Sequence, residues 1–157
     1  MITATIIKPF SFRNLTFRAK LTYVAHAFKA VVKLHHAWMD KLLRQFIDAN
    51  SVIFDIGGHS GQYAKLFARL APQGRVYTFE PGAYQRSILL HSMRLNRHHN
   101  VVVVDKGLSS APGYHSLITP LKKSGIFRFG LSHLTTKTGN SQFFSEDVNV
   151  TTIDTFA

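Results

Sequence analysis

The stretch that most constrains the fold of this chain runs from Val52 to Gly61. It reads Val-Ile-Phe-Asp-Ile-Gly-Gly-His-Ser-Gly, and the residues from Gln62 to Leu70 follow it with apolar side chains at helical spacing. An apolar run, a glycine-rich turn and a helix in direct succession are typical of a nucleotide-type site. Glycine lets a ligand approach the main chain, and the first N–H groups of a helix attract electron-rich groups. We therefore expect a strand over 51–56 that ends in a binding turn.

Strand and helix patterns alternate after this turn. Helices are predicted over 61–71 and 83–96, and further strands over 75–80 and 101–104. Short connections between alternating elements imply right-handed crossovers and a parallel sheet. The sequence therefore predicts an α/β fold with a Rossmann-like parallel sheet.

The pattern changes after Gly107. Short strands are predicted over 114–118 and 126–129, and a last alternating strand over 148–153. Asp154 follows at a position suited to a helix N-cap.

The N-terminal part is predicted to be helical from about residue 15 to residue 47, as one long helix or two joined helices. Its apolar or aromatic side chains recur at three- and four-residue steps, and they are Leu21, Val24, Ala25, Phe28, Val31, Val32, His35, Trp38, Leu42, Leu43 and Phe46. We expect this stripe to be buried against the following sheet; a partner chain and a membrane interface are the alternatives. His35 and His36 are adjacent and so point in different directions on a helix, and no metal site is predicted.

The chain carries a formal net charge of +11, from 19 Lys and Arg against 8 Asp and Glu. Such a balance suits nucleic acid, an anionic membrane surface or an anionic substrate, and it also occurs in basic proteins without any such partner. Because the positive residues are scattered and form no Arg-rich run, nucleic acid is not expected as a partner. A membrane surface is kept as the less favoured alternative.

Cysteine is absent, which excludes disulfides, thiolate metal ligands and cysteine nucleophiles. This composition suits a reducing compartment, and a cytoplasmic location is expected. Lys29 and Lys33 interrupt the apolar stretch 21–34, so no membrane-spanning helix is predicted.

Three acids lie at the ends of three consecutive predicted strands: Asp55, Glu80 and Asp105. In a parallel α/β sheet, ligands bind outside the carboxyl ends of the strands. We therefore expect the three carboxylates on one rim, around the Gly57–Gly61 turn. From that position Glu80 can accept hydrogen bonds from ribose hydroxyls, and Asp105 can reach a purine edge or an amino group.

Common nucleotide and nucleophile motifs are incomplete in this turn. A dinucleotide fingerprint would start at Gly57 but meets His59 at its third position and Gln62 at its sixth, which disfavours an NAD-dependent enzyme. No P-loop is found, and a nucleophile elbow that starts at Gly58 meets Gln62 where its last glycine belongs. The remaining Asp-x-Gly-x-x-x-Gly pattern favours a ligand with an adenosine and no phosphate chain.

This pattern resembles the first motif of class I S-adenosylmethionine-dependent methyltransferases. Within that class the chain resembles the FkbM family over about residues 51–157, through the segments Phe54–Tyr63, Gly74–Pro81, Asn100–Ser109, Gly130–Leu134 and Val150–Asp154.

The resemblance implies roles for the matching residues. Asp55, Gly57 and Gly61 would line the methionine and ribose part of S-adenosyl-L-methionine. Glu80 would bind the ribose diol, and Asp105 would lie near the adenine.

Gly58 and His59 also belong to the predicted cofactor site, although they depart from the family pattern. The family usually has Ala-Asn at these two positions, so an imidazole here replaces a common asparagine contact. No catalytic residue can be assigned.

The resemblance also implies the organisation and the activity. Residues 1–50 would form a basic helical segment, and 51–157 a partial methyltransferase domain that methylates an oxygen of a small molecule or saccharide. Family members continue beyond the last predicted strand with a strand bearing Lys-Ile-Asp-Val-Glu-Gly, so we expect an incomplete sheet and a truncated chain with weak or no activity. No oligomeric state is predicted. The alternative is a non-catalytic basic module that binds an anionic surface through its N-terminal helix.

Overall fold

The computed structural model describes residues 10–120, 132–135 and 143–157. The strand predicted over 126–129 and the first two residues of the Gly130–Leu134 motif lie outside the described residues.

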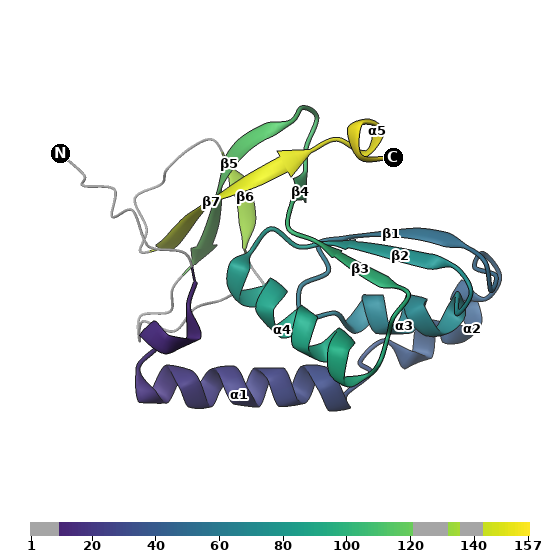
Figure 1. The fold of residues 1–157 in the computed structure, drawn as a ribbon, viewed down its shortest axis with the longest axis horizontal. Helices are drawn as coiled ribbons and strands as arrows, with labels where there is room; N and C mark the ends of the chain where they lie inside the picture. The colour runs from purple at the N-terminus through teal and green to yellow at the C-terminus, as the bar shows by residue number, and fades with distance from the viewer. Residues whose placement is uncertain (1–9, 121–131, 136–142) are drawn as a thin grey trace.

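A three-stranded parallel sheet forms the centre of the fold. Its strands are β1 (Val52–Ile56), β2 (Arg75–Phe79) and β3 (Val101–Val104), in the order β1-β2-β3. Helices α3 (Gln62–Leu70) and α4 (Ala83–Leu95) cover one face of this sheet (Figure 1). The predicted α/β class with a parallel sheet is confirmed, and each of these elements lies within a residue or two of its predicted bounds.

The core between the sheet and these helices is apolar. Ala64, Leu89 and Met93 are buried there, and Val101 and Val103 of β3 pack against them. The valine run of β3 therefore forms a strand because its side chains meet a helical layer.

The opposite face of the sheet carries aromatic side chains. The Phe54, Tyr77 and Phe79 rings lie 6.1, 5.4 and 4.8 Å from the ring of Phe156, which belongs to the short helix α5 (Ile153–Phe156). Thr152 is the N-cap of α5, since its hydroxyl accepts a hydrogen bond from the Thr155 N–H at 3.0 Å. The prediction that Asp154 forms this cap was wrong; Asp154 lies inside the helix.

A second sheet stands beside the carboxyl end of β3 (Figure 1). It contains β4 (Gly107–Leu108), β5 (Gly113–Pro120), β6 (His133–Thr135) and β7 (Phe143–Thr151), in the order β4-β7-β5-β6. β7 begins five residues before its predicted start at Val148, because residues 143–147 pair in antiparallel register along β5.

The N-terminal part takes the form of joined helices. α1 (Phe17–Val32) is followed by a 3-10 turn (Ala37–Met39) and by α2 (Asp40–Leu43). Another 3-10 turn, Phe12–Asn14, precedes α1. None of the described helices is long and apolar enough to cross a bilayer.

Side chains from α3 and α4 hold the C-terminal end of α1. The Ala30 carbonyl accepts hydrogen bonds from Gln62 Nε2 at 3.3 Å, Lys65 Nζ at 2.5 Å and Ser92 Oγ at 3.1 Å. Lys65 Nζ also donates to the Lys33 carbonyl. These donors satisfy carbonyls that a helix end would otherwise leave unpaired, and α1 ends at this point.

α1 packs against α4, and the prediction that its apolar stripe is buried against the sheet was wrong. Tyr23 and Ala30 of α1 are buried together with Ile88 of α4. Five side chains of the predicted stripe and its N-terminal extension are instead exposed: Phe17 (77%), Leu21 (56%), Val24 (55%), Phe28 (69%) and Val32 (60%). The division of the chain at residue 50 stays a prediction.

Replacing Lys65, which is 4% exposed, should loosen α1. We expect Lys65→Met to lower the free energy of unfolding by about 1–3 kcal/mol, because the Lys33 carbonyl loses its donor. Urea denaturation measures this loss, and faster hydrogen exchange in α1 than in β2 would localise it. The exposed Lys41→Met is the matched control, and equal stability of the two variants would contradict the expectation.

Candidate functional site

The turn after β1 is tied to the end of β2. The Phe79 carbonyl accepts hydrogen bonds from both Gly57 N–H at 2.9 Å and Gly58 N–H at 3.0 Å. The Gly61 N–H in turn donates to the Gly58 carbonyl at 2.8 Å, which closes the turn before α3. The glycine-rich segment is therefore a closed structure whose shape depends on β2.

Asp55 lies under this turn and is 7% exposed. The register pairs Asp55 with Thr78, and the Thr78 hydroxyl donates to Asp55 Oδ2 at 2.8 Å. Burial raises the pKa of the Asp55 carboxyl, and the Thr78 hydrogen bond opposes that rise. Gly58 fits tightly above them, because a Cβ there would lie 1.9 Å from Thr78 Oγ1.

Glu80 follows β2, is 6% exposed, and joins the turn through its carboxyl group. Its Oε2 accepts a hydrogen bond from His59 N–H and its Oε1 one from Gly82 N–H, both at 2.8 Å. Burial raises the pKa of Glu80, and the nearby Glu146 carboxyl adds to the rise, while both backbone hydrogen bonds and Arg86 oppose it. The carboxylate is thereby fixed beside the turn.

Two glycines of the turn have left-handed backbones, with φ of +78° at Gly57 and +84° at Gly61. A Cβ on Gly61 would lie 2.6 Å from Leu89 Cδ1, so this position sets how closely α3 approaches α4. A Cβ on Gly57 would meet nothing within 4 Å, so the space in front of its Cα is open. Gly57 is therefore the point where a ligand can approach the main chain.

Asp105 is the last of the seven residues predicted to bind the cofactor. It lies next to the other six but takes no part in the hydrogen bonds described above. The Glu80 N–H donates to the Val104 carbonyl at 3.0 Å. Because Asp105 follows Val104 in the chain, its backbone lies close to that of Glu80. Its side chain is exposed, unlike the buried carboxyls of Asp55 and Glu80. The structure brings Asp55, Gly57, Gly58, His59, Gly61 and Glu80 into one cluster and leaves Asp105 at its margin.

The groups available to a ligand suit an adenosine better than a phosphate chain. The N–H groups of Gly57, Gly58, His59 and Gly61 already donate to Phe79, Glu80 and Gly58, so these four form no phosphate cradle. The open face of Gly57 leaves room for a ligand, and the Glu80 carboxylate has further lone pairs, which are suited to hydroxyl donors.

Sequence reasoning missed four residues around this cluster. Thr78 could have been found from strand alternation, because it shares a sheet face with Asp55. His26 and Tyr84 meet across α1 and α4, with His26 Nδ1 2.9 Å from the Tyr84 hydroxyl. Desolvation lowers the pKa of His59, and the nearby His26 lowers it further. Glu146 of β7 accepts from Ala83 N–H at 3.3 Å. No sequence signal predicts contacts made by such distant segments.

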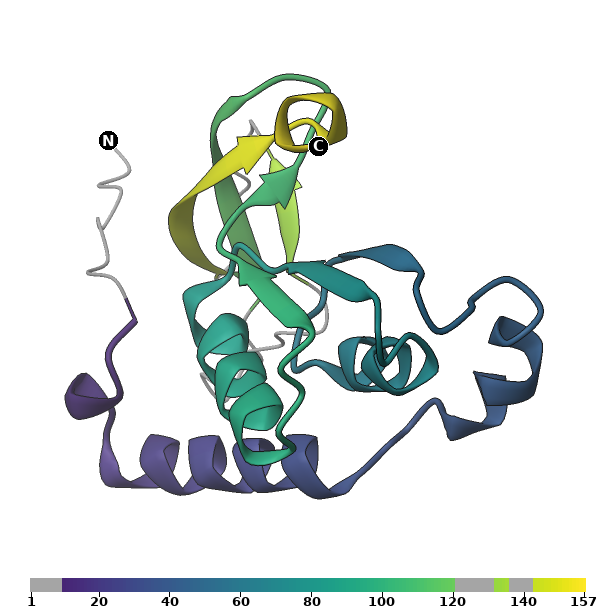
Figure 2. The ribbon, with the colours of Figure 1, turned by 45° about the vertical axis from the view of Figure 1, so that its right-hand side comes forward.

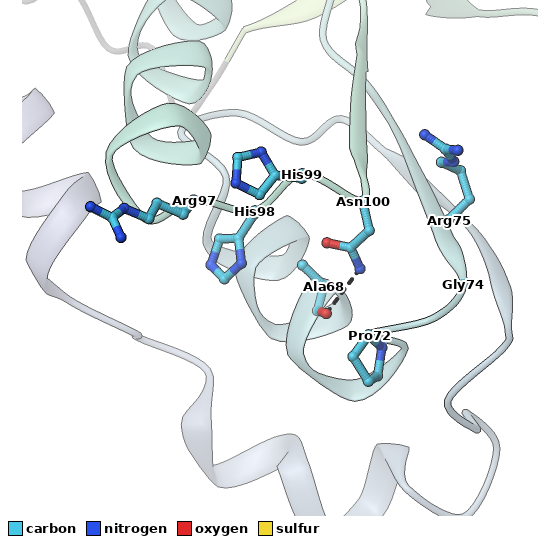
Figure 3. A pocket seen from close by; sticks show the side chains of 8 residues that line it. All are labelled: Ala68, Pro72, Gly74, Arg75, Arg97, His98, His99 and Asn100. Atoms are coloured by element: carbon cyan, nitrogen blue, oxygen red, sulfur yellow. Dashed lines mark hydrogen bonds between the residues drawn. The ribbon is translucent and has the colours of Figure 1, made fainter.

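A hollow of about 460 Å³ lies at the other rim of the sheet, before β2 and β3 (Figure 3). Arg75, Arg97, His98 and His99 are among its lining residues. Figure 3 shows the Arg97 side chain directed away from Arg75, so the two guanidinium groups do not converge on one point. Within the described ranges, no three His, Asp or Glu side chains are arranged to hold a metal ion.

Comparison with known proteins gives no family assignment. No protein-family model matches the sequence, and no curated protein matches it. The similar solved structures include a putative rRNA methylase from Clostridium thermocellum, with 18% identity, a TM-score of 0.41 and coverage of 48% of this chain and 44% of that one.

Two further solved structures are similar at the same level. A SAM-dependent O-methyltransferase from Thermotoga maritima has 9% identity and a TM-score of 0.40, with 73% of this chain and 65% of that chain covered. Methyltransferase FkbM from Methylobacillus flagellatus KT has 12% identity and a TM-score of 0.44, with 89% and 38% covered. The match spans less than two thirds of each of the three proteins, and at such TM-scores these likenesses carry no argument about activity.

Gly58→Ala should destabilise the protein, because the added Cβ would collide with Thr78 Oγ1. We expect a loss of about 1–3 kcal/mol in the free energy of unfolding, measured by urea denaturation. The double variant Gly58→Ala/Thr78→Ala should lose less than the sum of the two single variants, since Thr78→Ala removes the colliding atom. Additive losses would show that the two side chains do not meet.

Glu80 should make stability depend on pH. Its pKa is raised above the ordinary value of 4.5, so its contribution to stability is full below 4.5 and is lost as the pH rises through the raised pKa. Urea denaturation from about pH 4 to about pH 8 should show wild-type stability falling relative to that of Glu80→Gln. A constant difference between wild type and Glu80→Gln would contradict the expectation.

Proposed function

We propose that this chain binds S-adenosyl-L-methionine and belongs to a methyltransferase of FkbM type. One observation carries the proposal: the Glu80 carboxylate is held by His59 N–H and Gly82 N–H beside a glycine turn with open space at Gly57. Ligands of parallel α/β sheets bind outside the carboxyl ends of the strands, which is where this cluster lies. The ordered resemblance of the segments after residue 51 to FkbM proteins supports the same assignment.

The residues present fit the proposed cofactor in the following way. Glu80 would accept the ribose hydroxyls, Gly57 would let the ribose and methionine part approach the main chain, and Asp105 would lie near the adenine. Asp55 is buried and bonded to Thr78, so it would support the turn more than touch the ligand. When bound, the cofactor supplies an electrophilic methyl group.

The proposed reaction is methylation of an oxygen on a small molecule or saccharide. Methyl transfer needs mainly the alignment of the acceptor with the methyl group, and a hydroxyl acceptor also needs a base or a desolvated site. His26 of α1 lies near His59, and its Nδ1 is 2.9 Å from the hydroxyl of Tyr84 on α4. Desolvation lowers the pKa of His26, and burial raises the pKa of Tyr84 to about 12. Of the two, His26 is the one that can accept a proton at neutral pH.

Isothermal titration calorimetry with S-adenosylhomocysteine tests the cofactor assignment. We expect saturable binding that weakens by at least about tenfold in Glu80→Gln, because a carboxylate that accepts two hydroxyl donors is replaced by an amide. Asp154→Asn, an exposed acid on α5, is the matched control and should bind like wild type. Absence of binding, or equal binding by Glu80→Gln, would overturn the proposal.

A further inference from the structure

The exposed side of α1 carries a continuous apolar stripe. Phe17, Leu21, Val24, Phe28 and Val32 are each between 55% and 77% exposed. At about 100° per residue they fall in a sector roughly 80° wide along all of the helix. This grouping matters, because scattered exposed apolar residues are ordinary but a contiguous stripe marks an interaction surface.

The stripe points away from the rest of the molecule. Tyr23 and Ala30, the residues of α1 that are buried against α4, lie on the opposite side of the helix. Figures 1 and 2 both show α1 along the outside of the structure, with α4 on its inner side. The stripe is therefore available to a flat partner along all four turns of α1.

Positive side chains border the stripe on both sides. By the same helical geometry, Lys20 lies beyond one edge, and Arg18 and Lys29 lie beyond the other. No acid occurs in the sequence before Asp40, and α3 and α4 contain none either. The three helices α1, α3 and α4 therefore contribute no negative side chain that could offset these cations.

We propose that α1 binds the surface of an anionic lipid bilayer, with its axis in the plane of the interface. The stripe enters the boundary between headgroups and acyl chains, while Arg18, Lys20 and Lys29 contact lipid phosphates and carboxylates. A helix with large apolar side chains on one face and basic residues beside them has the composition of such interfacial helices. This proposal does not depend on the assignment of the cofactor.

The stripe itself favours lipid over other anionic partners. Nucleic acid is bound through phosphate contacts and needs no row of phenylalanine, leucine and valine. A second copy of the chain would cover the stripe, but it would bring together two basic surfaces without acids to pair with them. An anionic bilayer satisfies both the apolar and the charged part of this surface.

Co-sedimentation of the whole chain with lipid vesicles tests the proposal. We expect binding to vesicles of phosphatidylcholine and phosphatidylserine, and much weaker binding to phosphatidylcholine alone. Leu21→Gln/Phe28→Gln should abolish binding, and Leu90→Gln/Leu95→Gln should not, although Leu90 (51% exposed) and Leu95 (66% exposed) are equally accessible on α4. Lys29→Gln should weaken binding by about fivefold, whereas Arg94→Gln on α4 should not.

Three results would overturn the proposal. Equal binding to neutral and anionic vesicles would remove the role of the cations. An equal loss of vesicle binding in Leu21→Gln/Phe28→Gln and in Leu90→Gln/Leu95→Gln would show that the stripe has no specific role. A dimer in solution that Leu21→Gln/Phe28→Gln dissociates, without vesicle binding by wild type, would assign the stripe to a second copy of the chain. Circular dichroism of each variant confirms that the fold is retained.

Discussion

The carbonyl groups at the end of α1 need hydrogen-bond donors, and α3 and α4 supply them. Lys65 and Ser92 donate to Ala30, and Asn96 Nδ2 donates to Val31 at 3.2 Å. Gln62 links this set to the candidate site, because it follows Gly61 directly and accepts from His35 N–H at 3.1 Å. A buried carbonyl without a donor is costly, so packing against α3 and α4 stabilises the end of α1. The start of α3, and with it the glycine turn, is positioned by the same contacts.

Two buried carboxyl groups define the candidate site, and each is stabilised by a different kind of donor. Asp55 is bonded to a hydroxyl on the neighbouring strand, whereas Glu80 is bonded to two backbone N–H groups. Burying acids costs free energy, which the raised pKa values of both groups express. Titratable groups with perturbed pKa values gathered at one end of a parallel sheet are typical of functional sites.

The local sequence pattern was sufficient to predict the parallel sheet and its helices, because apolar runs and turn residues mark where each element begins and ends. It was insufficient where a distant segment provides the partner. Residues 143–147 at the start of β7 form a strand because β5 lies beside them, and Thr152 rather than Asp154 caps α5. The stripe of α1 had been expected on the sheet, yet α4 occupies the inner side of α1 through Tyr23 and Ala30.

The sequence by itself determined the strand–turn–helix unit around Gly57, the alternation that makes the sheet parallel, and the excess of positive charge. These properties follow from residue type and spacing along the chain. Only the tertiary structure decided that Glu80 is clamped by His59 and Gly82, that Asp105 stays at the margin, and that one side of α1 faces outward. These three features depend on which surfaces compete for burial and on which donors reach a buried oxygen. The local spacing of residues along the chain encodes neither the competition for burial nor the reach of the donors.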